Sequence, residues 1–360
     1  MLTFDVRKES FGAIVFDKMF YCFALIGNKH YDLLNSTIRG NDVVGRLSEY
    51  KELLLGGYLD GTRKKHLPSL ANIPTNLASH LSAPLAIGLI VTSKCNLDCK
   101  YCYARSNPVA EMSERDIQLI ADRLSNSRVM ACWISGGEPT LWPYLPRLIK
   151  VLGSRNIPVA IDSNGLKRSA KVLEEIADYG AFIRISLDSH KPEVHDSVRG
   201  NFHETWDTLK YLAASDRRIG VITVVHNQNA KYLKDFAHSL ADIGIHRWTV
   251  LELNDVRLNS DYRKMLCLSA SVFERYVSET FADSSSLGII MTIIRGTKPR
   301  STLLVGPDKY YYTVSGKGRG REILGRMNNE EICDIWSKRQ GISKPAHLLK
   351  YLGMQVDRRK

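Results

Sequence analysis

Short apolar runs alternate with stretches of helical period between residues 85 and 253. The apolar runs have the length and branched side chains of buried strands, and the segments between them repeat apolar residues every three or four positions. The pattern predicts strands at 85–91, 130–134, 157–161, 181–187, 220–225 and 246–253. It predicts helices at 114–127, 144–155, 167–179, 202–214 and 230–243.

Strands that alternate with helices imply parallel pairing through right-handed crossovers. Six such units are fewer than the eight of a closed TIM barrel. The predicted fold class is therefore α/β, with an open, partial (β/α)6 barrel. Its chemistry should lie at the carboxyl ends of the strands, as in other parallel α/β sheets.

The two ends of the chain have different patterns. Short apolar segments at 13–16 and 20–26 precede a helical stretch at 41–55, and three prolines mark a linker at 62–84. After residue 266 the pattern predicts helices at 269–281, 329–337 and 346–352, and strands at 288–294, 303–305 and 310–314. We therefore expect three domains: a small N-terminal α+β domain with its linker (1–75), the barrel (76–265) and a C-terminal α+β extension (266–360).

Three residues should begin or end helices of the barrel. Ser113 is the expected N-cap of the helix at 114–127. Gly180 and Gly244 should end the helices at 167–179 and 230–243, because glycine takes the left-handed conformation at little cost.

Composition places the chain among cytoplasmic globular proteins. Apolar residues make up 44% and charged residues 24%, and the longest apolar run is too short to span a bilayer. The first residues lack the basic-then-apolar order of a secretion signal. The seven cysteines are odd in number and mostly scattered, which argues against a disulfide framework and suits a reducing compartment.

The net charge of +12 is unevenly distributed. Residues 266–360 carry 16 basic and nine acidic side chains, a local excess of +7. This excess could form a solvated basic face, or a surface that attracts an acidic peptide or a nucleic acid. No aromatic-basic nucleic-acid motif accompanies it, so nucleic acid is the less favoured partner.

The main candidate for chemistry is a cysteine motif directly after the first predicted barrel strand. Cys95, Cys99 and Cys102 follow a C-x3-C-x2-C spacing. Three nearby thiolates suit iron, and they are one fewer than a four-iron cluster needs. A structural zinc site is the alternative, but zinc takes four ligands, and no second C-x2-C or H-x3-H pair occurs.

Two further motifs follow the second and third predicted strands, at 135–140 (SGGEPT) and 162–165 (DSNG). The glycines could form a simple tight turn, and Asp162 could be a solvated turn carboxylate. We expect His195 at the surface and Cys22 and Cys132 as small buried apolar residues.

In these motifs the sequence resembles the radical S-adenosylmethionine (radical SAM) superfamily. The matching segments are the three cysteines, 136–139 (GGEP), 163–165 (SNG), 184–188 (RISLD), 195–200 (HDSVRG) and 223–225 (TVV) with Asn229. They cover about residues 83–255, in order. The segments 184–188, 195–200 and 223–225 also match the branch of that family with cysteine-rich C-terminal extensions.

The resemblance implies one [4Fe–4S] cluster and S-adenosylmethionine (SAM) as cofactors. Cys95, Cys99 and Cys102 would bind three irons, and SAM would chelate the fourth and be cleaved to a 5′-deoxyadenosyl radical. The other implied cofactor residues are Tyr101 facing the adenine; Gly136, Gly137, Glu138 and Pro139 near the methionine amine; Ser163, Asn164 and Ser186 as hydrogen-bonding groups; Arg199 for the carboxylate; and Asp188 and Val225. Glu138 could instead support its turn, and Asp188 could cap the next helix.

Both ends carry weaker resemblances. The segments 4–7, Glu9 and 11–16 resemble a winged-helix-like, PqqD-like domain that binds leader peptides by strand addition. The alternative is a β-rich cap over the barrel. The C-terminal segment resembles the SPASM extension at 306–312, 323–327 and 332–336, but only Cys267 and Cys333 remain there. Two thiolates cannot hold a second [4Fe–4S] cluster, so we expect none.

These features predict a radical SAM enzyme that modifies a ribosomally made peptide or protein, for example by epimerisation or crosslinking. The alternatives are an enzyme acting on a small molecule or tRNA, and a silent binding protein. The expected partners are a precursor peptide held partly by the N-terminal domain and an external electron donor of flavodoxin or ferredoxin type, with no membrane. Cys267 or Cys333 could return a hydrogen atom to the substrate, or each could simply be a packing residue.

Overall fold

The computed structural model describes residues 4–9, 12–17, 22–27, 31, 82–84, 86–102, 109–215, 218–253, 258–294, 303–314 and 321–338. The chain divides into two compact units. One runs from Pro84 to Lys338, and the N-terminal sheet belongs to the other. The predicted helices at 41–55 and 346–352 lie outside the described residues.

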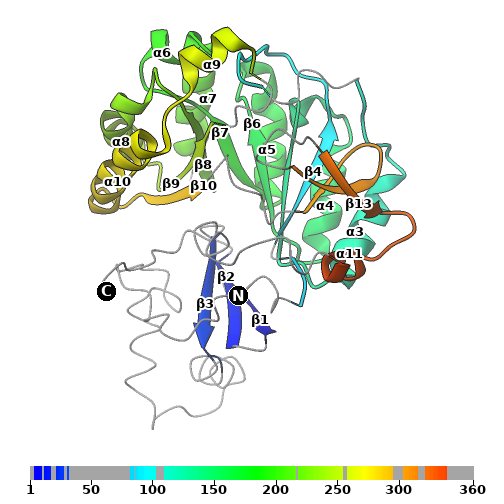
Figure 1. Cartoon of the computed structure of the whole chain (residues 1–360). Helices are drawn as coiled ribbons and strands as arrows, with labels where there is room; N and C mark the ends of the chain where they lie inside the picture. The colour runs from blue at the N-terminus through cyan, green and yellow to red at the C-terminus, as the bar shows by residue number, and fades with distance from the viewer. Residues whose placement is uncertain are drawn as a thin grey trace. The chain divides into compact units, whose positions relative to one another are not determined.

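The N-terminal sheet has three antiparallel strands in the order β1 (Phe4–Glu9), β2 (Gly12–Asp17) and β3 (Cys22–Gly27) (Figure 1). The apolar segments predicted at 13–16 and 20–26 fall on β2 and β3. On β1, Arg7 and Glu9 are both buried and form an ion pair with 2.7 Å between Nε and Oε1. Arg7 also donates to the carbonyl of Ala83, at 2.8 Å, so this pair holds the end of the linker against β1.

The larger unit alternates strands and helices as the sequence pattern predicts. Its first seven strands are β4 (Ala86–Thr92), β5 (Ala131–Gly136), β6 (Val159–Ser163), β7 (Phe182–Ser186), β8 (Ile219–Val225), β9 (Arg247–Glu252) and β10 (Ile290–Ile294). The main helices are α3 (Asp116–Asn126), α4 (Leu145–Ser154), α5 (Ala170–Asp178), α7 (Phe202–Ala213), α8 (Leu233–Asp242) and α10 (Ala270–Ser286). Shorter elements are η3 (Pro139–Leu141), η4 (Lys167–Ser169), η5 (Ala230–Tyr232), α6 (Pro192–Asp196) and α9 (Ser260–Leu266).

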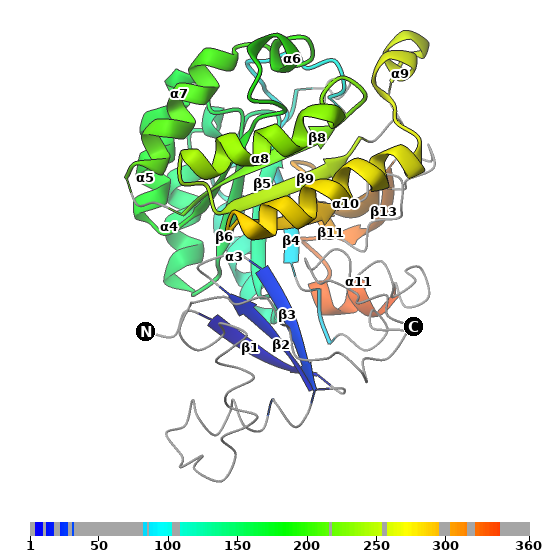
Figure 2. The same cartoon turned by 90° about the vertical axis from the view of Figure 1, so that its left-hand side faces the viewer.

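The strands β4 to β10 are parallel and lie side by side in chain order. The main helices cover one face of this curved sheet (Figures 1 and 2). On β7, Ile183 and Ile185 belong to the core between sheet and helices, while Arg184 and Ser186 alternate with them. Since side chains alternate across a strand, Arg184 and Ser186 lie on the inner, concave face.

Strands from the predicted C-terminal extension join both edges of the barrel sheet. At one edge β10 pairs in parallel with β9, and at the other β11 (Leu303–Val305) pairs in parallel with β4. β12 (Tyr310–Val314) and β13 (Arg321–Arg326) then continue the sheet antiparallel, and α11 (Ile332–Lys338) follows. The described part of this segment therefore extends the barrel sheet.

Arg123 on α3 holds the C-terminal hairpin to the barrel. Its Nε donates to the carbonyl of Met327 at 2.9 Å and its Nη2 to the carbonyl of Asn328 at 3.2 Å. The same guanidinium pairs with Glu331. One side chain thus satisfies two backbone carbonyls in the turn that connects β13 to α11.

The six strands predicted between residues 85 and 253 are confirmed as β4 to β9. Ser113 as the N-cap of α3 is wrong, because the N-cap position is Arg115 and the Ser113 hydroxyl donates to the Asp116 carboxylate at 2.8 Å. Gly180 and Gly244 do follow helices with φ of +86° and +79°. The pattern missed α6, α9 and β13, which are short and have little periodicity of their own.

Among the described residues, no helix combines the length and the apolar character that crossing a bilayer requires.

We expect Arg123→Ala to lower the free energy of unfolding by about 1–3 kcal/mol, because it leaves the partly buried Met327 carbonyl and the exposed Asn328 carbonyl without their donor. Hydrogen exchange should accelerate in residues 321–338. Arg147→Ala on α4 is the control, since it removes an exposed pair with Glu114 and should cost under about 0.5 kcal/mol. Equal effects of the two variants would contradict the anchoring role of Arg123.

Candidate active site

The cysteine motif forms an irregular loop that leaves the carboxyl end of β4. Cys95 is exposed, Cys102 half-buried and Cys99 buried. The Cys95 sulfur accepts from the Leu97 amide at 3.4 Å, and the Cys102 amide donates to the Cys99 carbonyl at 3.1 Å. The backbone between Cys99 and Cys102 therefore forms a turn.

The pKa values of Cys95 and Cys99 are both raised. Burial raises the pKa of Cys99 to about 11; the neighbouring Arg199 opposes this rise, and Cys95 and Cys102 add to it. Burial also raises the pKa of Cys95. Within the described ranges, no three His, Cys, Asp or Glu side chains are close enough together to hold one metal ion. A set of three cysteine thiols is the donor chemistry that iron–sulfur clusters take, so the residues present fit such a cluster.

Gly136 and Gly137 lie directly against the start of the cysteine loop. The Gly137 amide donates to the Thr92 carbonyl at 2.8 Å, and the Glu138 amide donates to the Lys94 carbonyl at 2.7 Å. A Cβ on either glycine would overlap those same two carbonyls, and Gly136 has a φ of +138°. The glycines thus let two backbone segments touch.

Glu138 is buried, and its carboxylate accepts four hydrogen bonds. The donors are the Thr140 amide (3.1 Å) and hydroxyl (2.7 Å), the Ser163 hydroxyl (2.9 Å) and the Asn164 amide (2.8 Å). Burial raises the pKa of Glu138, and these four donors oppose part of the rise. The carboxylate supports its own turn, where buried Pro139 begins η3, and joins it to the end of β6.

The third motif also contacts the cysteine loop. The Asn164 side-chain amide donates to Asn96 Oδ1 at 2.6 Å. Asn96 lies next to Cys95 and had no sequence signal of its own beyond that position. Ser163 has its hydroxyl on Glu138, whereas Ser186 is half-buried at the end of β7 and Val225 is buried at the end of β8.

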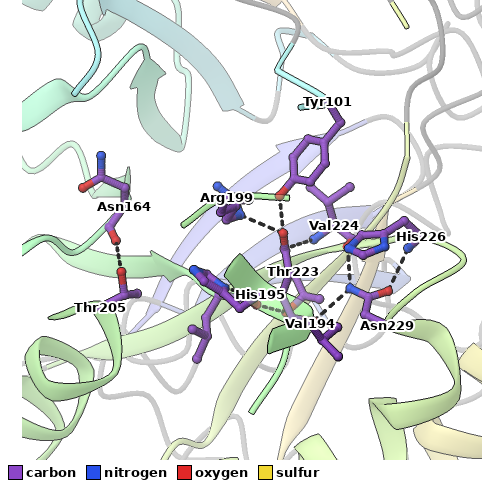
Figure 3. Close-up of polar contacts among 12 residues, drawn as sticks. Tyr101, Asn164, Val194, His195, Arg199, Thr205, Thr223, Val224, His226 and Asn229 are labelled. Carbon is purple, nitrogen blue, oxygen red and sulfur yellow. Dashed lines mark hydrogen bonds and ion pairs between the residues drawn. The ribbon is translucent and has the colours of Figure 1, made fainter. Parts of the chain in front are cut away.

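Asp188, two residues after β7, has no exposed surface and joins three parts of the rim. Figure 3 labels three of its partners, Tyr101, Arg199 and Val224. Its Oδ2 accepts from the Tyr101 hydroxyl and from Arg199 Nε, at 2.8 Å for the latter. Its Oδ1 accepts from the Val224 amide at 2.9 Å. Burial alone would raise the pKa of Asp188, but Arg199 and two nearby histidines hold it below its usual value.

The alternative role of Asp188 as a helix cap is wrong, since α6 begins after Lys191 and has no side-chain cap. The Asp188 carbonyl instead accepts from the side-chain amide of Asn229 at 2.9 Å (Figure 3).

Arg199 is paired with Asp188 through Nε alone, and its guanidinium carbon lies 5.1 Å from the centre of the Tyr101 ring. Its two terminal nitrogens have no partner among the described residues. The Tyr101 hydroxyl is already bonded to Asp188. Of the polar side chains at this rim, Arg199 is therefore well suited to receive an anionic group.

Two buried histidines flank Asp188, and the surface position expected for His195 is wrong. His195 is 1% and His226 0% exposed. His195 Nδ1 accepts from the Asp188 amide at 3.2 Å. Burial lowers the pKa of each imidazole to about 4, against the attraction of Asp188. Both rings are therefore neutral at pH 7.

Asp162 is not a solvated turn carboxylate, as one reading of its motif suggested. It lies on β6 and accepts from Arg184 on β7 through both oxygens, at 2.5 and 3.0 Å. The two residues are direct partners in the strand register. They place a charge pair on the inner face of the sheet, below the cysteine loop.

Three of the remaining cysteines, Cys132, Cys267 and Cys333, occupy different parts of the barrel unit. Cys132 is fully buried on β5, as predicted, whereas the side chain of Cys22 lies outside the described features. Cys267 ends α9 and packs, half-buried, in an apolar cluster that includes Tyr101 and Val198. The Cys333 thiol contacts the Ser127 carbonyl at the end of α3, which is the opposite end of the barrel.

The sequence profile of the Radical SAM superfamily matches residues 89–240, which include the cysteine loop and the rim just described. The chain contains a radical SAM domain. This superfamily uses a [4Fe–4S] cluster and SAM, in agreement with the predicted cofactors.

Curated relatives of this radical SAM domain include a bacteriocin biosynthesis protein and a maturase. The chain is 31% identical over 179 residues to the antilisterial bacteriocin subtilosin biosynthesis protein AlbA of Bacillus subtilis, which covers 48% of this chain and 40% of AlbA. It is 34% identical over 170 residues to the mycofactocin maturase MftC of Mycobacterium ulcerans, which covers 45% of each chain. The matches span less than half the length of either relative.

A solved structure with a similar fold aligns with this chain. Streptococcus suis SuiB superposes with a TM-score of 0.65, covering 98% of this chain and 94% of SuiB at 14% identity. At that identity the likeness shows the fold, and it confirms the predicted partial barrel of the radical SAM domain.

Gly137→Ala should destabilise the protein by about 1–3 kcal/mol, because the new Cβ overlaps the Lys94 carbonyl and must push the cysteine loop away. Thermal denaturation measures the effect. Gly153→Ala on α4 is the matched control: its Cβ would meet the Tyr179 oxygen at an ordinary 3.6 Å, and the change should be neutral or stabilising. A neutral Gly137→Ala would contradict the close packing of loop and turn.

Acidification should destabilise the protein through His195 and His226. Each folded-state pKa of about 4 lies below the ordinary value, so the unfolded chain binds more protons as the pH falls. The stability is complete above about pH 6.5, and each histidine should remove about 2 kcal/mol by pH 5. His226→Asn keeps an acceptor near Nδ1 but does not titrate, so it should lose about 2 kcal/mol less between pH 7 and 5. Chemical denaturation at each pH tests this, and identical losses in variant and wild type would contradict it.

Proposed function

We propose that the chain is a radical SAM enzyme that modifies a ribosomally made peptide or protein. The observation that carries this proposal is the loop with three cysteine thiols at the carboxyl ends of the parallel strands, next to Arg199, whose two terminal nitrogens have no partner among the described residues. Parallel α/β sheets place their chemistry at this edge.

We assign the residues of the rim to two tasks. Cys95, Cys99 and Cys102 hold the cluster, and the terminal nitrogens of Arg199 receive the SAM carboxylate by charge-assisted hydrogen bonds. When bound, the cluster supplies the electron that cleaves SAM to a hydrogen-abstracting radical. Glu138, Ser163 and Asn164 act by shaping the backbone, because their side chains bond to one another and to Asn96. Tyr101, Gly136, Gly137, Pro139, Ser186, Asp188 and Val225 remain proposed as surroundings of SAM.

Similar proteins and one feature of this chain support a peptide substrate. AlbA is named for subtilosin biosynthesis and MftC is named a maturase. SuiB was solved with its precursor peptide SuiA. Among the described strands of the N-terminal sheet, β3 is an edge strand, to which an extended leader peptide can add through backbone hydrogen bonds.

The thiol positions bear on a redox-neutral outcome such as epimerisation. Cys267 packs in the same cluster as Tyr101, whereas Cys333 lies at the opposite end of the barrel. If a thiol returns the hydrogen atom, this placement favours Cys267.

Cleavage of SAM is the first test. Protein reconstituted anaerobically with iron and sulfide, then given dithionite and SAM, should form 5′-deoxyadenosine. Cys99→Ala should reduce the yield by at least about 100-fold, because two thiols cannot hold the cluster. Cys333→Ala should retain it, since that thiol lies far from the loop. Turnover by Cys99→Ala would reject the proposed cluster site.

Substrate class is a separate question. A short peptide encoded beside the gene should bind with a submicromolar to micromolar Kd that changes little with salt, as expected for strand addition. Labelled tRNA should bind weakly and lose affinity steeply between 50 and 200 mM salt. Tight binding of tRNA with no binding of the peptide would contradict a peptide substrate and leave SAM cleavage intact.

A further inference from the structure

We propose that Asp188 is a positioning residue, whose buried carboxylate holds the cysteine loop in its iron-binding shape through Tyr101 before any iron is bound. This role rests on the proposed function, in which the cysteine loop binds an iron–sulfur cluster. It differs from contact with SAM, which the resemblance implied for this residue. The Asp188 carboxylate has no exposed surface, and both of its oxygens already accept hydrogen bonds from protein groups.

The tie to the loop is made between two of its cysteines. Tyr101 lies between Cys99 and Cys102, directly before Cys102. Its hydroxyl donates to Asp188 Oδ2. The backbone beside it is also held, since the Lys100 amide donates to the Val198 carbonyl at 2.9 Å. Together these bonds fix the second half of the cysteine loop.

The first half of the loop has its own side-chain tie, from Asn96 to Asn164. Residues 93–102 contain no helix or strand, so hydrogen bonds to other segments hold the conformation of this loop. Each residue ordered in advance spares the conformational entropy that cluster binding would otherwise cost. The hydroxyl of Tyr101 is thus a side-chain anchor of the segment between Cys99 and Cys102, while Ser93 and Lys94 hold the start of the loop to other segments.

Asp188 is suited to this task because it is itself immobile. The Val224 amide and Arg199 Nε hold its two oxygens, and the Asn229 amide holds its carbonyl (Figure 3). Its Oδ2 accepts from Tyr101 and Arg199 together. One acceptor, Asp188 Oδ2, therefore both holds the cysteine loop through Tyr101 and orients Arg199, the candidate cation for the SAM carboxylate.

The discriminating variant is Tyr101→Phe, which removes the hydroxyl and keeps the ring. Tyr262→Phe is the matched control: Tyr262 packs in the same apolar cluster, and its hydroxyl has no partner among the described residues. In the full-length apo protein, alkylation of each cysteine is followed by peptide mass spectrometry. Iron content is then measured after reconstitution with limiting and with excess iron.

Tyr101→Phe should alkylate Cys99 and Cys102 about 3- to 10-fold faster than Tyr262→Phe, with Cys132 and Cys333 unchanged in both. At limiting iron it should hold less than half the iron of the control, and excess iron should restore full loading. The unchanged cysteines separate a loosened loop from general destabilisation.

Two results would overturn the proposal: equal alkylation of Cys99 in Tyr101→Phe and Tyr262→Phe, or a parallel rise at all cysteines including Cys132. A wild-type protein that takes up no iron, yet shows the loop-specific effect, would reject the proposed function and leave the positioning role standing.

Asp188→Asn is a second variant with an added cost, because it leaves the Arg199 charge buried without its partner. Asp188→Asn combined with Arg199→Met removes that charge. The double variant should recover thermal stability relative to Asp188→Asn, while Cys99 stays as reactive as in Tyr101→Phe. Recovery of low Cys99 reactivity along with stability would contradict a role for Asp188 in holding the loop.

Discussion

One buried carboxylate, that of Asp188, organises the rim of this barrel. A charge without solvent contact is costly unless it is paired and hydrogen-bonded. Asp188 meets this requirement with partners from three places in the chain: Tyr101 in the cysteine loop, Arg199 after α6, and the Val224 amide on β8. Removing Arg199 leaves the buried carboxylate without its countercharge, and removing either neutral donor costs it a hydrogen bond. The rim is consequently a cooperative unit.

Glu138 repeats the same principle on the other side of the cysteine loop. Its buried carboxylate gathers donors from its own turn and from the end of β6. Gly136 and Gly137 then bring this turn against Thr92 and Lys94. Two buried carboxylates thus support a loop that has no regular secondary structure.

The residues of the recognised motifs fall into two groups: those bonded to neighbouring protein groups and those able to bind a cofactor. Several side chains that seemed suited to touch a cofactor have their polar atoms engaged by neighbours, as with Ser163, Glu138 and the Tyr101 hydroxyl. The three thiols and the terminal nitrogens of Arg199 retain donors or acceptors to offer. On the inner face below them, Asp162 and Arg184 neutralise each other as a pair.

The sequence by itself determined the alternation of strands and helices, the six central strands and the place of the cysteine loop. Hydrophobic period and local spacing carry that information directly. It did not show that β10 and β11 extend both edges of the sheet, that His195 is buried, or that Asp162 pairs with Arg184. Those outcomes depend on which strands become neighbours and which face a residue occupies. Only the folded sheet brings Tyr101, Asp188 and Arg199 to one carboxylate, because contacts between distant segments leave no periodic trace in the chain.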